Sequence, residues 1–563
     1  MNRAGRLLLT VFFLTCASSA LAESIAHRHI IAAANPYAAE AGLKMLRAHG
    51  SAVDAAIAAQ AVLTLVEPES SGIGGGAFMM LYDPAHRRVT SFDGRETAPQ
   101  SAAPTMFLDA SGKPRAHFDV VPGGLSVGVP GVIAMLELAH KRYGRLPWAT
   151  LFEPAITLAE KGFPVGRKLA ATIKAFPQMA KMPDIKRYFY KADGTPLEQG
   201  DILKNPELAS TLRAVAAEGA EALYSGDVAQ AIVDAVQHAP TNPGGMTLAD
   251  LSAYAPRELE PVCGPYRGYR ICSMGPPSSG GVGVIQILSM LEHFPSSSVA
   301  PGTLEGTQLF TQASRLAFAD RAKYLGDSSF VDVPLRGLLD PGYLAERAKL
   351  IEPGKDMGTA LAGSPPEQHA DYAPQRIPEL PGTSHLSVVD DRGEVVSMTT
   401  TVEFVFGSEM MVKGFFLNNE LTDFSFEPEV NGIPVANAPA PGKRPLSAMS
   451  PAIVFDPKGR FAIALGSPGG PLIIDFTTQA VLAMIDGHLS PQEAAAQPKV
   501  INLNSPTIVE KGTALEALIP QLTAMGHSVR SFALESGLHI VERVKDGYEG
   551  GADPRRDGVA VGD

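Results

Sequence analysis

Residues 382–390 read Gly-Thr-Ser-His-Leu-Ser-Val-Val-Asp, and their setting decides how the chain is interpreted. The segment before them, 353–382, contains six prolines and is predicted to be an exposed, irregular connector. The residues after them form two β-rich runs, 385–390 and 394–401, separated by Asp391-Arg392-Gly393. This pattern predicts a connector that ends in a β-hairpin.

Thr383 can be interpreted in two ways from these residues alone. It can be a turn residue before a strand, or it can be a nucleophile that the chain exposes by cutting itself. If the Gly382–Thr383 bond were cut, Thr383 would carry both a hydroxyl and an α-amine of pKa near 7.7–8.0, which can act as a base at neutral pH. Gly382 would allow a strained backbone before the cut.

The remaining periodicity predicts mixed helices and strands on both sides of the connector. Residues 452–455 and 461–465 form a second predicted hairpin around Asp456-Pro457-Lys458-Gly459. Four segments have helical patterns: 151–161, 208–218, 310–324 and 473–485. No internal repeat is present.

The first 22 residues have the pattern of a secretory signal peptide. Arg3 and Arg6 precede a short apolar run at 7–14, and Ala20-Leu21-Ala22 forms a small-residue cleavage site. Eight apolar residues cannot span a membrane, so cleavage after Ala22 is expected rather than anchoring.

Composition and motifs exclude several classes of protein. The 563 residues are 45% hydrophobic and 19% charged, with a net charge of −12, so neither disorder nor sequence-independent nucleic-acid binding is expected. The glycines at 72–76 follow a predicted helix, 53–65, and precede a predicted strand, 77–82, the reverse of the order in a dinucleotide site. Phosphate-binding and zincin motifs are absent from the sequence.

Two cysteines remain once Cys16 leaves with the signal peptide. If Arg267-Gly268 is a two-residue hairpin turn, Cys263 faces Cys272 in a pair whose side chains approach closely. A disulfide is allowed there and compatible with export, although two buried thiols are the alternative. A zinc site would need further ligands.

The sequence resembles the γ-glutamyltranspeptidase (γ-glutamyltransferase) family of N-terminal-nucleophile hydrolases across nearly all of the chain after the signal. The resemblance rests on motifs in a fixed order: 67–76 (EPESSGIGGG), 93–99 (DGRETAP), 276–281 (PPSSGG), 315–321 (RLAFADR), 417–425 (LNNELTDFS), 443–447 (KRPLS) and 466–470 (GSPGG).

The resemblance implies an α+β fold, a four-layer αββα sandwich built from two chains of one proenzyme. Autocatalytic cleavage between Gly382 and Thr383 would give a heavy chain, 23–382, and a light chain, 383–563. Thr383 would then form a γ-glutamyl ester that water or an amino acceptor resolves. Thr401 would hydrogen-bond the nucleophile, and the N–H groups of Gly469 and Gly470 would form the oxyanion hole.

The resemblance also assigns the groups that hold the substrate's head. Arg95 would clamp the α-carboxylate, a role that suits its bidentate fork, and Ser447 would add a hydroxyl. Glu420 and Asp423 would take the α-ammonium, and Glu403 fits the same acidic side.

Several positions depart from the family pattern. Ala448 replaces the second serine of a pair, so one hydrogen bond to the substrate carboxylate should be missing. Pro471-Leu472 stands where Ser-Arg is frequent, and Gln312 where Glu is common. The expected lid, 424–446, lacks a gating aromatic between Phe426 and Phe455.

These departures leave a second activity open. Cephalosporin acylases of the same family remove glutaryl-like groups from β-lactams. Glutaryl lacks the α-ammonium, so Glu403, Glu420 and Asp423 favour γ-glutamyl substrates such as glutathione. A non-catalytic exported binding protein is the third possibility, which the intact nucleophile region disfavours. The resemblance implies no metal or organic cofactor, no nucleic-acid partner, and a periplasmic or extracellular location.

Overall fold

The computed structural model describes residues 25–375 and 382–563, and its centre is the hairpin that follows Thr383. Strands β9 (Ser384–Val389) and β10 (Val395–Thr401) pair antiparallel, with Ser384 opposite Thr400. They lie in the middle of a seven-stranded sheet. The other strands of this sheet, in spatial order around the hairpin, are β22 (Val559–Gly562) and β1 (Ile30–Ala33) on one side, and β2 (Gly76–Asp83), β3 (Arg88–Gly94) and β6 (Arg257–Leu259) on the other.

A second, six-stranded sheet contains the other predicted hairpin. Strands β15 (Ala452–Phe455) and β16 (Phe461–Gly466) lie where the sequence predicts them, and they pair antiparallel. The full order is β21 (Gly547–Ala552), β20 (His539–Val544), β16, β15, β8 (Tyr269–Ser273) and β7 (Val262–Tyr266). Each sheet therefore combines strands from both sides of Thr383.

The two sheets pack face to face. Val389 and Val395 of the first sheet share an apolar cluster with Ile453 and Val541 of the second. Polar contacts join them as well, because Ser387 Oγ donates to the carbonyl of His539 at 3.0 Å. Since side chains alternate along a strand, Thr383 belongs to the same inner face as His385, Ser387 and Val389.

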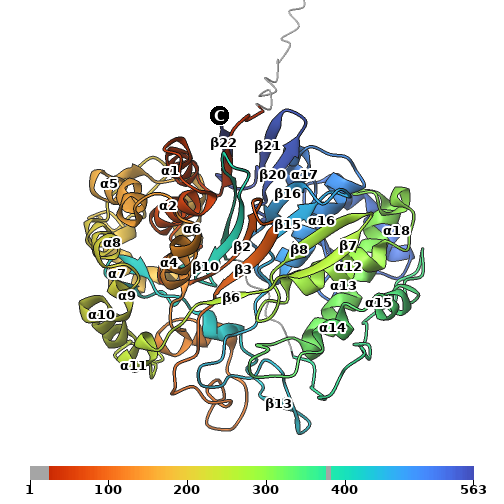
Figure 1. Ribbon diagram of the computed structural model, residues 1–563. Coiled ribbons are helices and arrows are strands. Elements are labelled where there is room, and N and C mark those ends of the chain that lie inside the picture. Colours follow the sequence, from red (N-terminus) through yellow and green to blue (C-terminus); the bar gives the residue numbers. More distant parts are fainter. Residues whose placement is uncertain (1–24, 376–381) are drawn as a thin grey trace, which may run out of the picture.

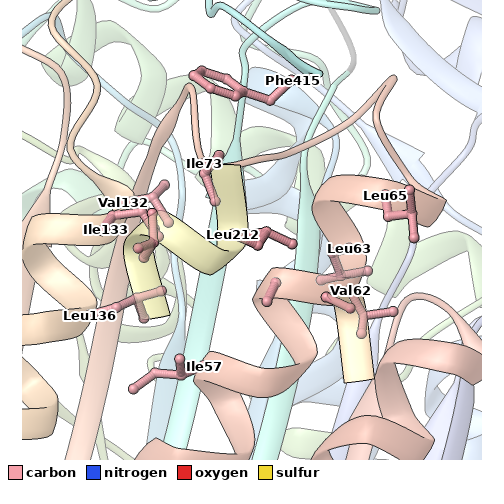
Figure 2. Close-up of a cluster of buried hydrophobic side chains, with 14 of the residues drawn as sticks. Ile57, Val62, Leu63, Leu65, Ile73, Val132, Ile133, Leu136, Leu212 and Phe415 are labelled. Carbon is pink, nitrogen blue, oxygen red and sulfur yellow. The ribbon is translucent and has the colours of Figure 1, made fainter. Parts of the chain in front are cut away.

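Helices cover the outer face of each sheet (Figure 1). Leu386 and Val388 point away from the second sheet into the larger apolar core, part of which Figure 2 shows around α2. The helices on this side include α1 (Pro36–Arg47), α2 (Ala52–Val66), α4 (Val132–Tyr143), α5 (Glu153–Lys161), α8 (Pro206–Glu218) and α10 (Gly226–Gln237). Those on the other side include α12 (Gly280–Leu291), α13 (Leu304–Tyr324), α16 (Ile473–Ile485) and α17 (Pro491–Ala496). The predicted αββα sandwich is confirmed.

Most predicted elements agree with the structure to within two residues, and the differences have local causes. Helix α13 begins at Leu304 rather than 310, because Thr303 caps it by accepting from the N–H of Gly306. Helix α5 begins at Glu153 rather than 151, since residues Trp148–Phe152 form a 3₁₀ turn and Pro154 suits a first helical turn.

The connector is irregular, as predicted, but it is only partly exposed. Residues 353–375 contain no helix or strand, whereas 376–381 lie outside the described residues. Ala373 and Gln375 are buried, and the N–H of Ala373 donates to the carbonyl of Pro434 at 3.0 Å. The prediction of a fully exposed connector is therefore wrong, because this end of it packs against the segment 424–446.

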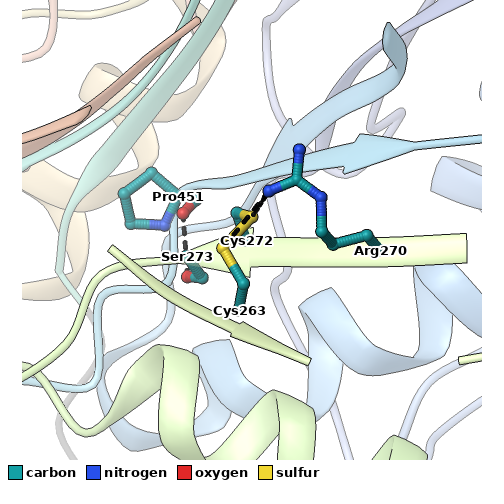
Figure 3. The surroundings of a disulfide bond; sticks show 5 residues. All are labelled: Cys263, Arg270, Cys272, Ser273 and Pro451. Atoms are coloured by element: carbon teal, nitrogen blue, oxygen red, sulfur yellow. Dashed lines mark hydrogen bonds between the residues drawn. A yellow bond between two sulfur atoms is a disulfide. The ribbon is translucent and has the colours of Figure 1, made fainter. Parts of the chain in front are cut away.

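The hairpin of β7 and β8 has the predicted register, with Cys263 opposite Cys272 (Figure 3). Both turn residues, Arg267 and Gly268, have positive φ (49° and 81°), as a tight two-residue turn requires. The two sulfur atoms form a disulfide with a Cα–Cα distance of 4.1 Å. The bridge lies on the second sheet, away from Thr383.

The described residues were compared with the requirements of a membrane-spanning helix and of a metal site. Within 25–375 and 382–563, no helix is long and apolar enough to cross a membrane. The same residues contain no group of three or more His, Cys, Asp or Glu side chains arranged to hold a metal ion. The predicted signal peptide, 1–22, lies outside them.

Candidate active site

Thr383 lies at the start of β9, buried between the two sheets. Its side chain faces that of Thr401 at the end of β10, and Thr383 Oγ1 donates to Thr401 Oγ1 at 3.2 Å. Thr401 Oγ1 also accepts from the N–H of Glu403 at 2.8 Å. The register of the hairpin produces this pair, because Ser384 is opposite Thr400 one residue further in. Thr383 and Thr401 are thus brought together by local strand pairing.

The backbone at Thr383 has an unusual conformation. Its φ is +99°, a region that β-branched residues rarely adopt and that stores strain of about 1–3 kcal/mol. The surroundings hold it there: the N–H of Thr383 donates to the carbonyl of Ser70 at 3.1 Å, and its carbonyl accepts from Arg556 Nη1 at 2.9 Å. The strain is located at the bond that the sequence predicts to be cut.

Gly382 and Gly469 meet on the other side of this bond. A Cβ on Gly382 would lie 1.7 Å from the carbonyl oxygen of Glu403, so only glycine fits there. The N–H of Gly469 donates to the carbonyl oxygen of Gly382 at 3.3 Å. Gly469 and Gly470 have φ of +135° and +57°, and they form the turn between β16 and α16. The carbonyl that Thr383 would attack therefore already contacts one backbone donor.

Arg95 is the centre of the other end of the site. It is fully buried, and its guanidinium donates to the carboxylates of Glu420 and Asp423. The same guanidinium also donates to the carbonyls of Pro445 at 3.1 Å and Leu446 at 2.9 Å. Arg95, Glu420 and Asp423 are brought together as predicted, but they bind one another instead of forming separate positive and negative patches.

Burial shifts the ionisation of two acids of the site, Glu420 and Glu403. It raises the pKa of Glu420 to about 7, although Arg95 opposes that rise. It also raises the pKa of Glu403 well above its usual range, and the charges of Asp423 and Glu420 add to the effect. Asn419 Nδ2 donates to the Glu403 carboxylate. Glu403 and Glu420 therefore hold protons more readily than exposed carboxyl groups do, which limits the negative charge of the site.

One cavity joins the two ends of the site. Its lining contains the predicted residues Arg95, Thr383, Thr401, Glu403, Glu420, Asp423, Ser447 and Gly470, together with Arg321, Gln375, Leu446, Ala448, Met449, Pro471 and Ile473. Ser447 Oγ accepts from the N–H of Met449 at 3.1 Å. Two departures from the family pattern, Ala448 and Pro471, line this cavity, whereas Gln312 does not: it binds Asp356 and the N–H of Met357.

Sequence reasoning did not assign a role to several residues that touch this site. Ser70 and Arg556 hold the backbone of Thr383, and Arg321 and Gln375 line the cavity. Arg321 lies in the motif 315–321. A basic residue in a helix that is otherwise buried is the feature of the sequence that could have indicated a functional role for it. Ser70 acts through its carbonyl, so no side-chain pattern could have identified it.

The site combines the hydroxyl of Thr383 with the N–H of Gly469, which donates to the carbonyl oxygen of Gly382. Its other end is a charged pocket centred on Arg95. A hydroxyl and an oxyanion donor are the requirements of acyl transfer. The charged pocket fits a small polar acyl group that carries its own charges.

Comparisons with known proteins give one consistent result. The family model for gamma-glutamyltranspeptidase matches residues 38–563. A glutathione hydrolase proenzyme of Bacillus subtilis (strain 168) is 39% identical over 545 residues, which cover 95% of this chain and 91% of that protein. An acylase ACY 1 proenzyme of Pseudomonas sp. (strain SE83) is 35% identical, covering 95% and 93%. The crystal structure of a cephalosporin acylase from Bacillus halodurans matches with a TM-score of 0.84 and 28% identity, covering 99% of each chain.

Proposed function

The chain belongs to the gamma-glutamyltranspeptidase family, and from this premise we propose that it is a self-cleaving γ-glutamyltransferase and glutathione hydrolase with Thr383 as its nucleophile. The observation that carries the proposal is the contact of Thr383 Oγ1 with Thr401, beside a scissile carbonyl that accepts from Gly469. Hydrolysis and transfer share the acyl-enzyme and differ only in whether water or an amine resolves it.

Maturation begins with attack of Thr383 Oγ1 on the carbonyl carbon of Gly382. The oxygen of that carbonyl gains negative charge and is stabilised by the N–H of Gly469, a donor of the kind worth about 3–4 kcal/mol. The C–N bond breaks, the nitrogen takes the proton that the hydroxyl lost, and Gly382 becomes an ester on Thr383. Water hydrolyses this ester, leaving heavy chain 23–382 and light chain 383–563.

Catalysis repeats the chemistry on the substrate. The freed α-amine of Thr383 accepts the proton of Oγ1, which attacks the γ-carbonyl of a γ-glutamyl amide such as glutathione. Gly469 and Gly470 stabilise the oxyanion, and the leaving amine takes the proton as the amide bond breaks. Water or an amino acceptor then attacks the γ-glutamyl ester and regenerates Thr383. Thr401 orients the nucleophile throughout.

The head of the substrate would be bound by exchange of ion pairs. Its ammonium would bind between Glu420 and Asp423, with Glu403 nearby, and its carboxylate would take N–H groups of Arg95 that those acids now occupy. Asp423 is the most accessible of the three, since its side chain is 28% exposed. The exchange keeps the charge of the pocket balanced.

A glutaryl acylase activity is the second candidate, favoured by Ala448 at the carboxylate side of the cavity. The acidic residues argue against it as the main activity, because glutaryl has no ammonium to neutralise Glu420 and Asp423. The relatives include both glutathione hydrolase and acylase proenzymes.

The test uses purified enzyme expressed with its leader. A denaturing gel should show two chains, and N-terminal sequencing should read Thr383 for the smaller one. The larger one should begin at Glu23 if residues 1–22 direct export to the periplasm or the medium. A single intact chain that still turned over substrate would refute the mechanism.

Substrate choice is tested by comparing kcat/KM on γ-glutamyl-p-nitroanilide and glutaryl-p-nitroanilide. The proposal expects faster release from the γ-glutamyl substrate, and faster glutaryl release would make the acylase the main activity. Addition of glycylglycine measures transfer, because an acceptor that competes with water raises the rate of p-nitroaniline release.

A further inference from the structure

Arg321 is a buried arginine that faces the catalytic cavity. It lies in the last turn of α13, is 5% exposed, and lines the same cavity as Thr383 and Ser447. Its Nε donates to Ser279 Oγ at 2.7 Å. Its Nη1 is buried and has no hydrogen-bond partner among the described residues.

Within residues 25–375 and 382–563, no carboxylate forms a direct ion pair with Arg321, although the charge of Asp423 acts on it from a greater distance. The neighbouring acid in the sequence, Asp320, points elsewhere: its carboxylate accepts from Arg347 at 3.1 Å and from the hydroxyl of Tyr343 at 2.7 Å. Burial lowers the pKa of Arg321 to about 10, which still leaves it charged at neutral pH. A buried guanidinium with no carboxylate in direct contact and an unpartnered N–H is costly, which favours the binding of an anion beside it.

Arg95 presents the opposite situation. Two carboxylates of the protein, Glu420 and Asp423, already neutralise it, and backbone carbonyls occupy further N–H groups. A substrate carboxylate reaching Arg95 must displace an internal partner. A substrate carboxylate reaching Arg321 would displace none.

The contacts of Ser279 connect Arg321 to the carboxylate side of the cavity. Ser279 Oγ accepts from Arg321 Nε and donates to the carbonyl of Ser447 at 2.6 Å. The N–H of Ser279 also donates to that carbonyl, at 2.8 Å. The guanidinium is therefore held against the segment that carries Ser447 and Ala448.

We propose that Arg321 binds the free carboxylate of the acyl group, together with Arg95 and Ser447, and supplies the attraction that the missing hydroxyl at Ala448 does not. The inference rests on the proposed function, since it concerns the substrate of the same site. It assigns to Arg321 the selection of acyl groups that end in a carboxylate, whether or not they carry an α-ammonium.

Three p-nitroanilides separate the two charges of the substrate. The γ-glutamyl compound has both charges, the glutaryl compound only the carboxylate, and the 4-aminobutyryl compound only the ammonium. For Arg321→Gln, we expect kcat/KM to fall at least about tenfold on the first two, mainly through KM, because a hydrogen bond to a charged group is lost. The 4-aminobutyryl rate should change less than about threefold. Arg321→Lys should restore part of the loss, because it keeps the charge without the fork.

The matched control is Arg315→Gln on the same helix. Arg315 is equally buried and contacts Asp356 at 3.3 Å, but it does not line the cavity. This variant should lower thermal stability without a substrate-dependent change in KM. Rates are normalised to the cut fraction on a gel, so that impaired maturation is not mistaken for impaired binding.

An equal loss on all three substrates would overturn the inference, because it would make Arg321 a purely structural residue. Binding of glutarate, followed as an increase in Tm, gives a readout without turnover. Glutarate should stabilise the cut wild type and not Arg321→Gln; stabilisation of both to the same extent would also overturn the inference. Failure of the proposed function would appear separately, as a wild type that is uncut or inactive on every substrate.

Discussion

The two ends of the catalytic cavity are built by different physical means. At the nucleophile end, Thr383, Thr401 and Gly469 are neutral groups positioned by strand register and a backbone turn. At the head-group end, the buried Arg95 and Glu420 and the partly exposed Asp423 are charged groups from distant parts of the chain that hold one another. Catalysis at the nucleophile end depends on the precise positions of these groups, whereas substrate binding and stability at the head-group end depend on the balance of charges. Substitutions should therefore abolish chemistry at one end and weaken recognition and stability at the other.

The largest effect is expected for Thr383→Ala. Without the hydroxyl, neither the Gly382–Thr383 bond nor a substrate amide can be attacked, so the protein should remain one chain and lose about a thousandfold or more in kcat/KM. Gel analysis and p-nitroanilide release measure the two effects. Thr383→Ser, which keeps a hydroxyl, should still be cut; processing of the alanine variant would show that another group is the nucleophile.

Next in size is Arg95→Gln, which tests the charge balance at the head-group end. It leaves the buried Glu420 and the partly exposed Asp423 without their cation, and the unpaired buried carboxylate costs about 3–5 kcal/mol in the free energy of unfolding. Activity on γ-glutamyl-p-nitroanilide should fall about a hundredfold, measured on the folded, cut fraction.

The double variant Arg95→Gln, Glu420→Gln is the control for this interpretation. It removes an unpaired charge, so it should recover part of the lost thermal stability without recovering activity. If the double variant were less stable than Arg95→Gln, charge balance would not be what holds this end together.

A smaller effect, in the favourable direction, is expected for Ala448→Ser. The added hydroxyl can donate to the substrate carboxylate beside Ser447, so KM should fall about tenfold for γ-glutamyl and glutaryl substrates. The 4-aminobutyryl substrate has no carboxylate and should be unaffected. An unchanged KM for all three would place the carboxylate elsewhere in the cavity.

The smallest effect concerns Glu69, which precedes the Ser70 carbonyl that accepts from Thr383. Burial raises the pKa of Glu69 to about 7, so the folded state keeps this proton to higher pH than the unfolded state does. Its contribution to stability is present below about pH 4.5 and is lost as the pH rises through 7. Glu69→Gln should reduce the fall in Tm between pH 5 and pH 8, measured by thermal unfolding.

The matched control for Glu69 is Glu346→Gln on the surface of the molecule, where the carboxylate is largely exposed. This variant should keep the pH dependence of the wild type. If both variants flattened the curve equally, the burial of Glu69 would not be the cause.

The hairpin at the nucleophile end could be predicted from local rules, but the roles of its residues came from the family resemblance. The alternation of residues 385–401 predicts the two strands, the resemblance implies that Thr401 contacts Thr383, and the observed register places the two opposite each other. The glycines at 469 and 470 occupy positive φ, which favours glycine. The same local logic predicts the pairing of Cys263 with Cys272 across a two-residue turn.

The head-group end could be predicted only as a set of residues. The family resemblance assigns Arg95 to a carboxylate and Glu420 and Asp423 to an ammonium, but it does not show that the three side chains bind one another. The resemblance leaves Arg321 without a role. A helical pattern cannot show that the adjacent acid, Asp320, binds Arg347 and Tyr343 instead of Arg321. The partial burial of the connector was missed for the same reason: its partner, Pro434, is 61 residues away.

The sequence by itself determined the positions of most helices and strands and the two hairpins, because strand alternation and turn chemistry act over short distances. Its motifs, through their resemblance to a family, supplied the αββα fold, the nucleophile candidate and the residues around it. The tertiary structure decided which charges are satisfied internally and which are left for a ligand. That outcome depends on side chains hundreds of residues apart meeting in a buried cavity, where removal from water makes an unpartnered charge costly. Arg95 and Arg321 are both buried arginines, and only their surroundings show that Arg95 donates to two carboxylates while Arg321 contacts none directly.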